Sequence, residues 1–500
     1  MRSYECSCSD MRSCLADTRN TGMLRMIPTL RQYQDDNMNE ARAAFRSGHS
    51  AVLYEAPTGS GKGMCIGYMA SCAAKLGTHT GIVVHRVELL RQILRALDMF
   101  GVPYGVVHPD YQQRNELIMV GTVQTMIRRF IEPRKLLMLD EAHHAVARMW
   151  GDLMAAHPSA KVFGFTATPC RTNNSGRGLG DVFTYMVKGP TPRELMDSGF
   201  LCPATVYTPP LPGDMSGKGL KSRAGDYSPE SLAALMDRSE ITGKAIDHYR
   251  QYLDGRPSVA FCSTVEHAIH VAGEFRDAGY RSLAVYGAMP KNEREYAMDA
   301  FAGGDVDVLT SKDLISEGVD VPGIVGVINL RLTRSLGWHI QSMGRGLRVA
   351  PGKAEAIILD HAGNCLRNLH MPDTDHEWTL ENGVVQRAKD DAPKIRQCAM
   401  CYFVHVWAVS CPKCGYVYEV KARKAVKEAA GELVVVSREE AVQMFKDVSR
   451  ITARGERMRV LNVVARSMGK KGKAASGWAY VMANNSAART SALARIEEAV

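Results

Sequence analysis

The chain has 500 residues, 45% of them hydrophobic, and a formal net charge of +9. Its length corresponds to about two to four domains of ordinary size, and its hydrophobic content suffices to bury several cores. No window approaches the roughly 18 uninterrupted apolar residues of a membrane span, and residues 1–22 lack the apolar segment of a signal peptide. These properties exclude a membrane protein, and we expect the chain to reside in the cytoplasm.

The N-terminal part of the chain has the pattern of an α/β domain. Residues 1–25 match no structural pattern, so we expect them to be disordered and assign them no function. Short apolar runs then alternate with helix-like stretches, which predicts β-α units and a parallel sheet. These runs are residues 51–56, 80–85, 117–122, 135–140 and 162–168. We assign residues 26–205 to this first domain and expect functional residues just after the carboxyl ends of its strands.

The first apolar run leads into a candidate phosphate-binding loop, "EAPTGSGKG". Its glycines allow backbone N–H groups to turn toward phosphates, and its lysine supplies a charge for the β- and γ-phosphates. Two positions depart from the Walker A pattern, because Ala56 replaces the first glycine and Gly63 replaces the hydroxyl that binds magnesium. The predicted nucleotide contacts are Thr58, Gly59, Ser60, Gly61 and Lys62.

An acidic motif, "LLMLDEAHH", follows about eighty residues after the loop. Its four apolar residues predict a buried strand, whose end carries Asp140 toward Mg²⁺ and Glu141 toward an attacking water. A phosphate loop paired with such a strand is typical of an ATPase that uses magnesium. The sequence therefore predicts ATP and Mg²⁺ as cofactors.

A second α/β domain is predicted at residues 229–370. The preceding segment 206–228 is rich in Gly, Pro and polar residues, and we interpret it as an interdomain connection or a surface insertion. The apolar runs of the second domain are residues 257–263, 281–287, 305–311, 323–330 and 355–360. Two similar parallel sheets in tandem leave a cleft between them.

The C-terminal part contains a candidate zinc site and a basic tail. Residues 371–420 hold two Cys-x-x-Cys pairs nine residues apart, the spacing of a zinc ribbon, and four thiolates satisfy tetrahedral Zn²⁺ without an open catalytic position. The predicted ligands are Cys398, Cys401, Cys411 and Cys414. Whether the ribbon contacts DNA or only anchors the C-terminus stays open. Residues 421–500 read as a helical tail whose last fifty residues are basic, which favours a nucleic-acid partner.

Three motifs together resemble the DEAD/DEAH class of superfamily-two helicases: "DEAH" at 140–143, "FTATP" at 165–169 and "QSMGRGLR" at 341–348. Within that class the chain is similar to phage and bacterial helicases related to the Res motor subunits of restriction enzymes. The resemblance implies two tandem RecA-like parallel-sheet domains. It also implies a nucleic-acid partner, DNA in preference to RNA, and residence in the host cytoplasm if the chain is encoded by a phage.

The resemblance also implies roles for residues outside the phosphate loop. In the first domain it implies adenine recognition by Gln34, with Arg31 nearby. It implies that four residues contact the nucleic-acid backbone: His85, Arg86, Thr122 and Gln124. It also implies that Thr166 and Thr168 couple hydrolysis to those contacts.

In the second domain the resemblance implies that Arg345 and Arg348 reach across the cleft toward the γ-phosphate, where a guanidinium stabilises charge in the transition state. It also implies that Gln341, of the same motif, is a catalytic residue. It further implies that Gly318 and Asp320 link the nucleotide state to domain closure. Lys312 stands where many relatives have a hydroxyl, and it is a candidate phosphate contact. Arg294, in "VYGAMPKNERE", is a weaker candidate for a contact with the strand.

Three functions are compatible with these residues. The leading hypothesis is a DNA-dependent ATPase that translocates along or unwinds nucleic acid. The second is an ATP-gated DNA-binding clamp whose hydrolysis was weakened or lost through Gly63. The third is the motor subunit of a nuclease complex. We also expect partner proteins that act in replication, recombination or DNA cleavage.

Overall fold

The computed structural model describes the chain in several stretches. These are residues 28–129, 131–170, 178–210, 220–223, 226–228, 232, 235–236, 239–312, 323–381, 383–384, 394–418, 438–448, 458, 460–462, 464–465, 479 and 482. Contacts divide the chain into two compact units, residues 1–418 and 419–500. The candidate site lies in the first unit.

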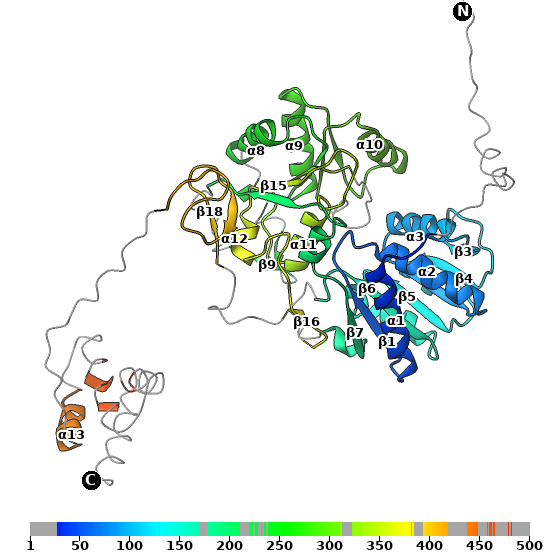
Figure 1. Ribbon diagram of the computed structural model, residues 1–500, viewed down its shortest axis with the longest axis horizontal. Helices are drawn as coiled ribbons and strands as arrows, with labels where there is room; N and C mark the ends of the chain where they lie inside the picture. The colour runs from blue at the N-terminus through cyan, green and yellow to red at the C-terminus, as the bar shows by residue number, and fades with distance from the viewer. Residues whose placement is uncertain are drawn as a thin grey trace, which may run out of the picture. The chain divides into compact units, whose positions relative to one another are not determined.

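The first sheet of this unit is entirely parallel, and its strand order among the described residues is β3-β4-β2-β5-β6-β1-β7 (Figure 1). The strands are β1 (Ala51–Glu55), β2 (Thr80–Val84), β3 (Tyr104–Val107), β4 (Ile118–Thr122), β5 (Leu136–Asp140), β6 (Lys161–Thr166) and β7 (Tyr185–Lys188). Central strands β1 and β2 are buried along their whole length, as expected for strands covered on both faces. Because all strands run in one direction, the segments that follow β1, β5 and β6 all lie on the carboxyl-terminal side of the sheet.

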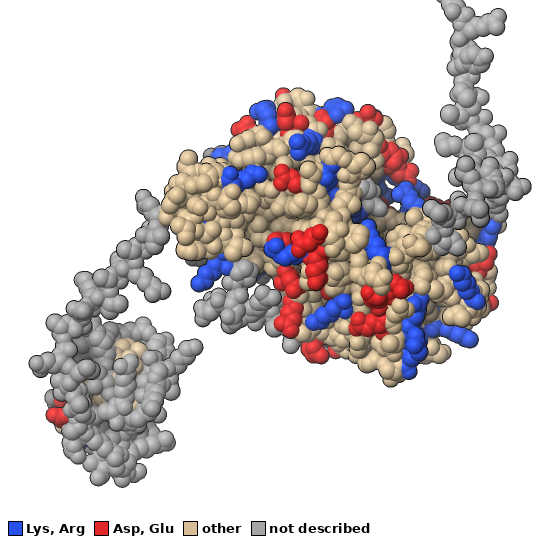
Figure 2. Space-filling view, viewed as in Figure 1, with Lys and Arg blue, Asp and Glu red and all other residues tan. Residues whose placement is uncertain are grey.

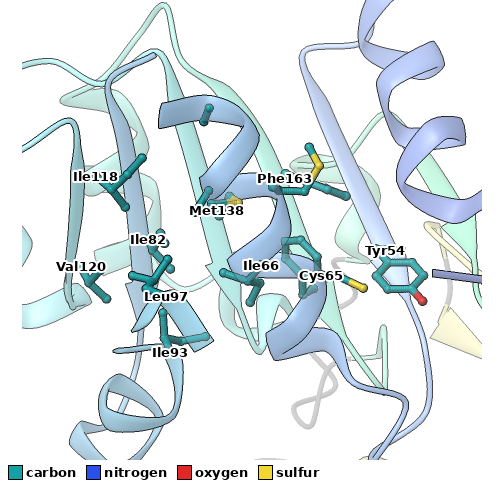
Figure 3. Packing of buried hydrophobic residues seen from close by; sticks show 14 of the residues in the cluster. Tyr54, Cys65, Ile66, Ile82, Ile93, Leu97, Ile118, Val120, Met138 and Phe163 are labelled. Atoms are coloured by element: carbon teal, nitrogen blue, oxygen red, sulfur yellow. The ribbon is translucent and has the colours of Figure 1, made fainter. Parts of the chain in front are cut away.

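Helices cover both faces of the first sheet. One face carries α1 (Gln32–Arg46), α2 (Lys62–Lys75) and α3 (Val87–Met99), while α4 (Val123–Arg128) and α5 (Arg148–Ala155) pack on the other. Figure 3 shows how α2 and α3 place Ile66 and Ile93 over Ile82 and Met138 of the sheet. Burial of each such side chain stabilises the fold by about 1.5–3 kcal/mol. Short elements complete the unit, namely η1 (Ala142–His144), η2 (Leu179–Asp181) and α6 (Pro192–Asp197).

The second sheet is also parallel, with the order β12-β13-β11-β14-β15-β8 among the described residues. Its strands are β8 (Ala204–Tyr207), β11 (Ser258–Phe261), β12 (Ser282–Val285), β13 (Val308–Ser311), β14 (Gly326–Asn329) and β15 (Ala356–Asp360). Its helices are α8 (Ser239–Tyr252), α9 (Val265–Asp277), α10 (Lys291–Gly303), α11 (Leu336–Gly344) and α12 (Asn364–Asn368). Helices α8 and α9 share one hydrophobic cluster with the sheet, and α10 and α11 share another. The predicted fold of two parallel-sheet α/β domains is confirmed.

Three two-stranded elements accompany the large sheets. They pair β9 (Ser222–Arg223) with β10 (Asp226–Tyr227), β16 (Trp378–Thr379) with β17 (Gly383–Val384), and β18 (Ile395–Gln397) with β19 (Val404–Val406). The β9–β10 pair lies in the segment predicted as a connection or insertion. There Asp226 accepts hydrogen bonds from Thr333 Oγ1 at 2.8 Å and from Arg334 N at 2.7 Å, so this part of the segment is attached to the second domain.

All ten predicted strand runs correspond to strands of the two sheets, but the apolar runs did not indicate β3, β7 or β8. These three strands are only four residues long, and each contains residues that are not fully buried. Strand β8 spans the predicted domain boundary at residue 205 and pairs with β15 of the second sheet. The chain therefore enters the second sheet at Ala204, and the other domain boundaries stay predictions.

The C-terminal unit contains α13 (Arg438–Asp447) and its own hydrophobic cluster. The buried residues of that cluster are Phe445, Val448, Leu461, Val464, Ala479 and Met482. The predicted disordered segment 1–25 lies outside the described residues, as do Gly318 and Asp320 and most of the predicted basic tail. Across the helices that the structure does describe, none combines the length and the apolar character needed to cross a membrane.

Candidate functional site

The phosphate loop connects β1 to α2, in the strand-loop-helix order that its sequence requires. Gly59 and Gly61 have φ angles of +88° and +84°, a region that favours glycine. A Cβ added at Gly61 would lie 2.5 Å from Gln34 Nε2, so space also excludes a side chain there. At Gly63, by contrast, no atom apart from the adjoining residues and the α2 backbone lies within 4 Å of the position that a Cβ would occupy. The departure at Gly63 therefore leaves open space beside the loop.

Side chains at the start of α1 brace the loop. Gln34 Nε2 and the Tyr33 hydroxyl both donate to the carbonyl of Ser60, at 2.9 and 2.6 Å. Gln34 Oε1 accepts from Arg31 N at 3.0 Å, and only 3% of Gln34 is exposed. The amide predicted to read adenine thus holds the loop here, and its role in adenine recognition stays a prediction. The guanidinium of Arg31 lies 4.1 Å from the ring centroid of Phe200, an aromatic residue that the sequence motifs did not reveal.

Lys62 occupies the first position of α2 and points back over the loop. Its ammonium group donates to the carbonyls of Ala56 at 2.9 Å and Pro57 at 3.1 Å. Burial lowers the pKa of Lys62, and the carboxylates of Glu141 and Asp140 oppose that shift. Because these acids lie close enough to stabilise the ammonium charge, the structure brings the two predicted halves of the ATPase site together.

The two acids follow from the end of β5. Asp140 is 8% exposed, and burial, reinforced by the charge of Glu141, raises its pKa to about 6, while Lys62 acts in the opposite direction. Asp140 Oδ1 also accepts a hydrogen bond from Glu141 N at 3.0 Å. The backbone of Glu141 has a φ of +49°, which is uncommon for a residue with a side chain. Such a local conformation is frequent at functional sites.

A line of polar side chains runs from Glu141 to the second domain. His143 Nδ1 lies 3.3 Å from Glu141 Oε2 and 3.1 Å from Thr166 Oγ1. Thr166 Oγ1 in turn accepts from Thr168 N at 3.1 Å. Across the cleft, Gln341 Nε2 donates to Thr168 Oγ1 at 3.4 Å. His143 was not among the predicted site residues, although the "DEAH" motif contains it.

Helix α11 brings the predicted arginines to the phosphate loop. A Cβ added at Gly344 would lie 2.7 Å from Thr58 Cβ, so the absence of a side chain permits close contact between the two domains. Arg345 is 4% exposed, and burial lowers the pKa of Arg348 to about 10. Both arginines line a cavity of about 420 Å³ together with Lys62, Asp140 and Glu141. The cavity also includes Arg31 and Phe200, and its volume lies within the range of ligand pockets.

Among the described residues, three ion pairs join the first domain to α10 of the second domain. Glu88 and Arg91 of α3 face Arg294 and Glu295 of α10, at 3.5 and 2.5 Å respectively. The third pair joins Asp110 to Lys291 at 2.5 Å. Helix α3 therefore lines the cavity with some residues and pairs with the second domain through others. Arg294, a weaker candidate for contact with nucleic acid, is thus engaged in an interdomain ion pair.

The other predicted nucleic-acid contacts lie after the ends of parallel strands. His85 and Arg86 follow β2, and Lys312 follows β13. Thr122 is 5% exposed, and its hydroxyl accepts from Thr125 N at 3.4 Å, which caps α4. Gln124 is exposed on the same helix. Their contacts with nucleic acid stay predictions, as do the roles of the other site residues.

A second cavity of about 340 Å³ lies against the phosphate loop and is lined in part by Glu55, Thr58, Gly344 and residues 374–378. Glu55 is 9% exposed, and burial raises the pKa of its carboxyl to about 8, an effect that Lys62 partly offsets. The folded chain therefore binds this proton more tightly than the unfolded chain does, for which 4.5 is the ordinary pKa. The contribution of Glu55 to stability is complete below about pH 4.5 and is lost as the pH rises through about 8.

Replacing Glu55 with Gln is expected to flatten the pH dependence of stability. The amide has a similar shape and does not ionise, so it removes a loss of up to about 1.4 kcal/mol per pH unit between about pH 5 and 8. The measurement is the melting temperature of both proteins across this pH range. Glu293→Gln, the same change at an exposed position of α10, is the matched control. Equal pH slopes for wild type and Glu55→Gln would contradict the expectation.

The four predicted zinc ligands converge in the described structure. Their sulfur atoms all lie within 4.8 Å of one another, with Cys398 and Cys414 at 3.6 Å and Cys401 and Cys411 at 3.7 Å. A tetrahedral ion with Zn–S bonds of about 2.3 Å requires sulfur separations of about 3.8 Å, whereas a disulfide requires about 2.05 Å. The cluster is therefore compatible with zinc.

Comparison with known proteins agrees with this geometry. The family model "Type III restriction enzyme, res subunit" matches residues 27–171, and "Helicase conserved C-terminal domain" matches residues 243–350. A 51.5 kDa protein of a Lactococcus phage is 31% identical over 393 residues, which covers 77% of this chain and 82% of the phage protein. A Saccharomyces cerevisiae protein named as the ATP-dependent helicase IRC3 is 27% identical over 67% of this chain, but the match spans only 52% of the yeast protein.

Among solved structures, a fragment described as an HsdR subunit of a type I restriction enzyme from Vibrio vulnificus matches with a TM-score of 0.53 and 20% identity. The match covers 72% of this chain and 68% of the fragment, and it supports the fold. The two family models fall on the two sheets that share the cavity, and the phage relative covers most of the chain. The chain is therefore a superfamily-two helicase, related to the Res subunits of restriction enzymes, and an ATP-dependent enzyme of nucleic-acid metabolism.

Proposed function

We propose that the chain binds ATP with Mg²⁺ in the cavity shared by its two sheets and uses hydrolysis to move along or unwind DNA. The observation that carries this proposal is the shared lining of the cavity. Lys62, Asp140 and Glu141 come from the first sheet, and Arg345 and Arg348 come from the second. A nucleotide bound there would touch both domains, so its hydrolysis can change how they contact each other. The family match to Res subunits favours DNA as the polynucleotide.

The residues of the first domain divide the chemistry among them. Lys62 exchanges the carbonyls of Ala56 and Pro57 for the β- and γ-phosphates, while loop N–H groups hold the same phosphates. Asp140 would hold Mg²⁺, and the charge of the bound ion would favour the ionised carboxylate over the protonated form that burial favours. Glu141 orients the attacking water. Bound Mg²⁺ supplies neutralisation of the charge on the phosphate oxygens.

The second domain completes the site when the cleft is closed. Arg345 and Arg348 stabilise the charge that spreads over the transferred phosphoryl group, and their guanidinium groups suit its oxygens. The polar line from Glu141 through His143 and Thr166 to Gln341 connects the water-orienting group to the second domain. We infer that this line transmits the state of the nucleotide to contacts with the DNA.

The two hypotheses, a motor and an ATP-gated clamp, differ in whether hydrolysis survives without the magnesium-binding hydroxyl that Gly63 replaces. Mg²⁺ retains several waters and takes few protein ligands, so a water can occupy the place of the missing hydroxyl. Replacing Gly63 with Thr is expected to lower the Mg²⁺ concentration for half-maximal hydrolysis by about 2- to 10-fold, the value of one added polar contact. The open space at this position accommodates the side chain. Gly63→Ala, which adds no hydroxyl, is the matched control, and equal Mg²⁺ dependence in both variants would contradict the expectation.

The test of the proposed function is steady-state ATP hydrolysis by the whole chain in Mg²⁺. Turnover is compared without polynucleotide and with single-stranded DNA, duplex DNA or RNA. We expect DNA to stimulate turnover more than RNA does, and Lys62→Ala defines the background. Undetectable turnover combined with ATP-dependent DNA binding would instead identify a clamp. Stimulation by RNA alone would overturn the assignment of DNA.

We further infer that Cys398, Cys401, Cys411 and Cys414 hold one structural Zn²⁺, since their sulfur separations fit a tetrahedral ion. Thiolates that bind a metal rather than form disulfides fit a reducing compartment such as the cytoplasm. The family match to restriction-enzyme subunits also supports a partner protein, and a nuclease is the class that would use a DNA motor.

A further inference from the structure

The zinc-ribbon segment, residues 394–418, exposes an unusual set of apolar side chains. Among the described residues, no other stretch of 25 residues has as many large hydrophobic side chains in solvent. They are 57% to 67% exposed, and they are Met400, Val406, Trp407, Val409 and Val417. Several exposed large apolar residues in one small element indicate a surface for binding a partner. The motor cavity does not include them.

The charge of the segment limits the class of that partner. Residues 394–418 contain Lys394, Arg396 and Lys413 and no Asp or Glu. In Figure 2 the ribbon forms a tan surface with blue at its borders. A surface that combines apolar groups with positive charge, and lacks negative charge, is complementary to a polyanion that also has flat apolar groups. Single-stranded nucleic acid has both properties.

Trp407 is held in a way that suits stacking. Its backbone N–H donates to the carbonyl of Lys394 at 2.7 Å, while 57% of the residue stays exposed. The guanidinium of Arg396 lies 3.2 Å from the ring centroid of Tyr418 and 5.8 Å from that of Trp407. Arg396 also donates to the carbonyl of Ala408 at 3.5 Å. The exposed indole ring therefore lies beside a cation that Tyr418 and the carbonyl of Ala408 hold in place.

The ribbon is attached to the second sheet next to the carboxyl end of β8, on the side where nucleic acid is predicted to bind. Thr208, just after β8, donates its N–H to the carbonyl of Tyr402 at 3.0 Å, and Tyr207 packs against Phe403 with ring centroids 6.2 Å apart. In this parallel sheet the carboxyl ends of β8 and β13 lie on the same side, and β13 directly precedes the predicted phosphate contact Lys312. Four strand spacings of roughly 4.8 Å separate β13 from β8, or about 19 Å. A short single strand can span this distance.

We propose that the exposed face of the ribbon binds single-stranded nucleic acid. Trp407 stacks on an unpaired base, the neighbouring apolar side chains contact further bases, and Lys394, Arg396 and Lys413 hold phosphates. This surface lies outside the two matched family models, so it adds a contact to the motor and rests on the proposed action on nucleic acid.

The test measures binding of a fluorescent oligo(dT) by the whole chain without nucleotide. Trp407→Ala is expected to weaken the affinity by about 5- to 100-fold, the range for loss of one stacked base, whereas Trp407→Phe retains most of it. Affinity for a blunt duplex should change less than twofold, because paired bases offer no free face. Ultraviolet crosslinking of an oligonucleotide that contains 5-iodouracil should modify the peptide that includes Trp407.

Controls separate this surface from other effects. Leu76→Ala removes an exposed apolar side chain at the end of α2 and should leave the affinity unchanged. Equal zinc content in all variants shows that the ribbon is folded. Unchanged oligo(dT) affinity in Trp407→Ala would overturn the proposal, and so would a change in oligomeric state that accounts for the loss. Because binding is measured without nucleotide, the result does not depend on whether the chain hydrolyses ATP.

Discussion

Replacing Arg345 with Ala is expected to lower the kcat of DNA-stimulated ATP hydrolysis by about 10³-fold or more. The residue comes from the second domain, is 4% exposed and lines the cavity that also contains Lys62. Its guanidinium can therefore stabilise the transition state only when both domains close on the nucleotide. The measurement is kcat at saturating DNA and ATP, with ATP binding measured separately. We expect ATP binding to weaken far less than kcat falls.

Two further variants define the cause of that loss. Arg345→Lys keeps the charge but loses the planar fork of donors, so it should recover little of the activity. Arg334→Ala removes an exposed guanidinium of the same domain that stacks over Tyr227 and does not line the cavity, and its kcat should match wild type. Wild-type turnover in Arg345→Ala would refute the proposed role of this arginine.

Removing the metal from the cysteine cluster is expected to unfold the ribbon. The hydrophobic cluster around these cysteines is small, and its buried residues are Cys398, Cys411 and Tyr418. Structural zinc contributes about 10–16 kcal/mol in zinc-finger peptides, which far exceeds what so few buried side chains supply. Cys411→Ser should lower bound zinc from one ion per chain to near zero and make residues 394–418 sensitive to proteases. Elemental analysis and limited proteolysis are the measurements.

The control for this expectation is Cys72→Ser, which removes a half-buried thiol of α2 outside the cluster. It should keep the full zinc content and the protease resistance of the ribbon. A chelator should reproduce the effect of Cys411→Ser in the wild-type chain. Purified wild-type protein without zinc, or unchanged zinc in Cys411→Ser, would refute the metal assignment.

Most of the strands that the sequence predicted share one physical property. Strands such as β1 and β2 are buried on both faces of a parallel sheet, so they appear as continuous apolar runs. Strands β3, β7 and β8 lie at the edges of the sheets, and each keeps part of its length exposed. Their short mixed sequences do not differ from loops. Edge position alone did not decide recognition, because β12 also lies at the edge of its sheet and was predicted from its apolar run.

Some residues of the candidate site were predictable from the sequence and others were not. The phosphate loop was predictable because its glycines and Lys62 satisfy a local requirement for positive φ angles and a phosphate charge. Local motifs did not reveal Phe200 in the cavity that Lys62 and Arg345 line, or the ion pairs between α3 and α10. These contacts join segments far apart in the chain, and no short pattern encodes them.

The sequence by itself determined the class of enzyme, the order of its two α/β domains, and the identity of the groups proposed for phosphate, magnesium and zinc. These features depend on residue types at short spacings, because backbone geometry and ligand chemistry act within a few residues. Only the tertiary structure decided that Gly344 meets Thr58, that Gln341 reaches Thr168 and that Glu55 is buried beside the loop. Those contacts depend on how two separately folded sheets pack, and the packing is determined by surfaces assembled from the whole chain.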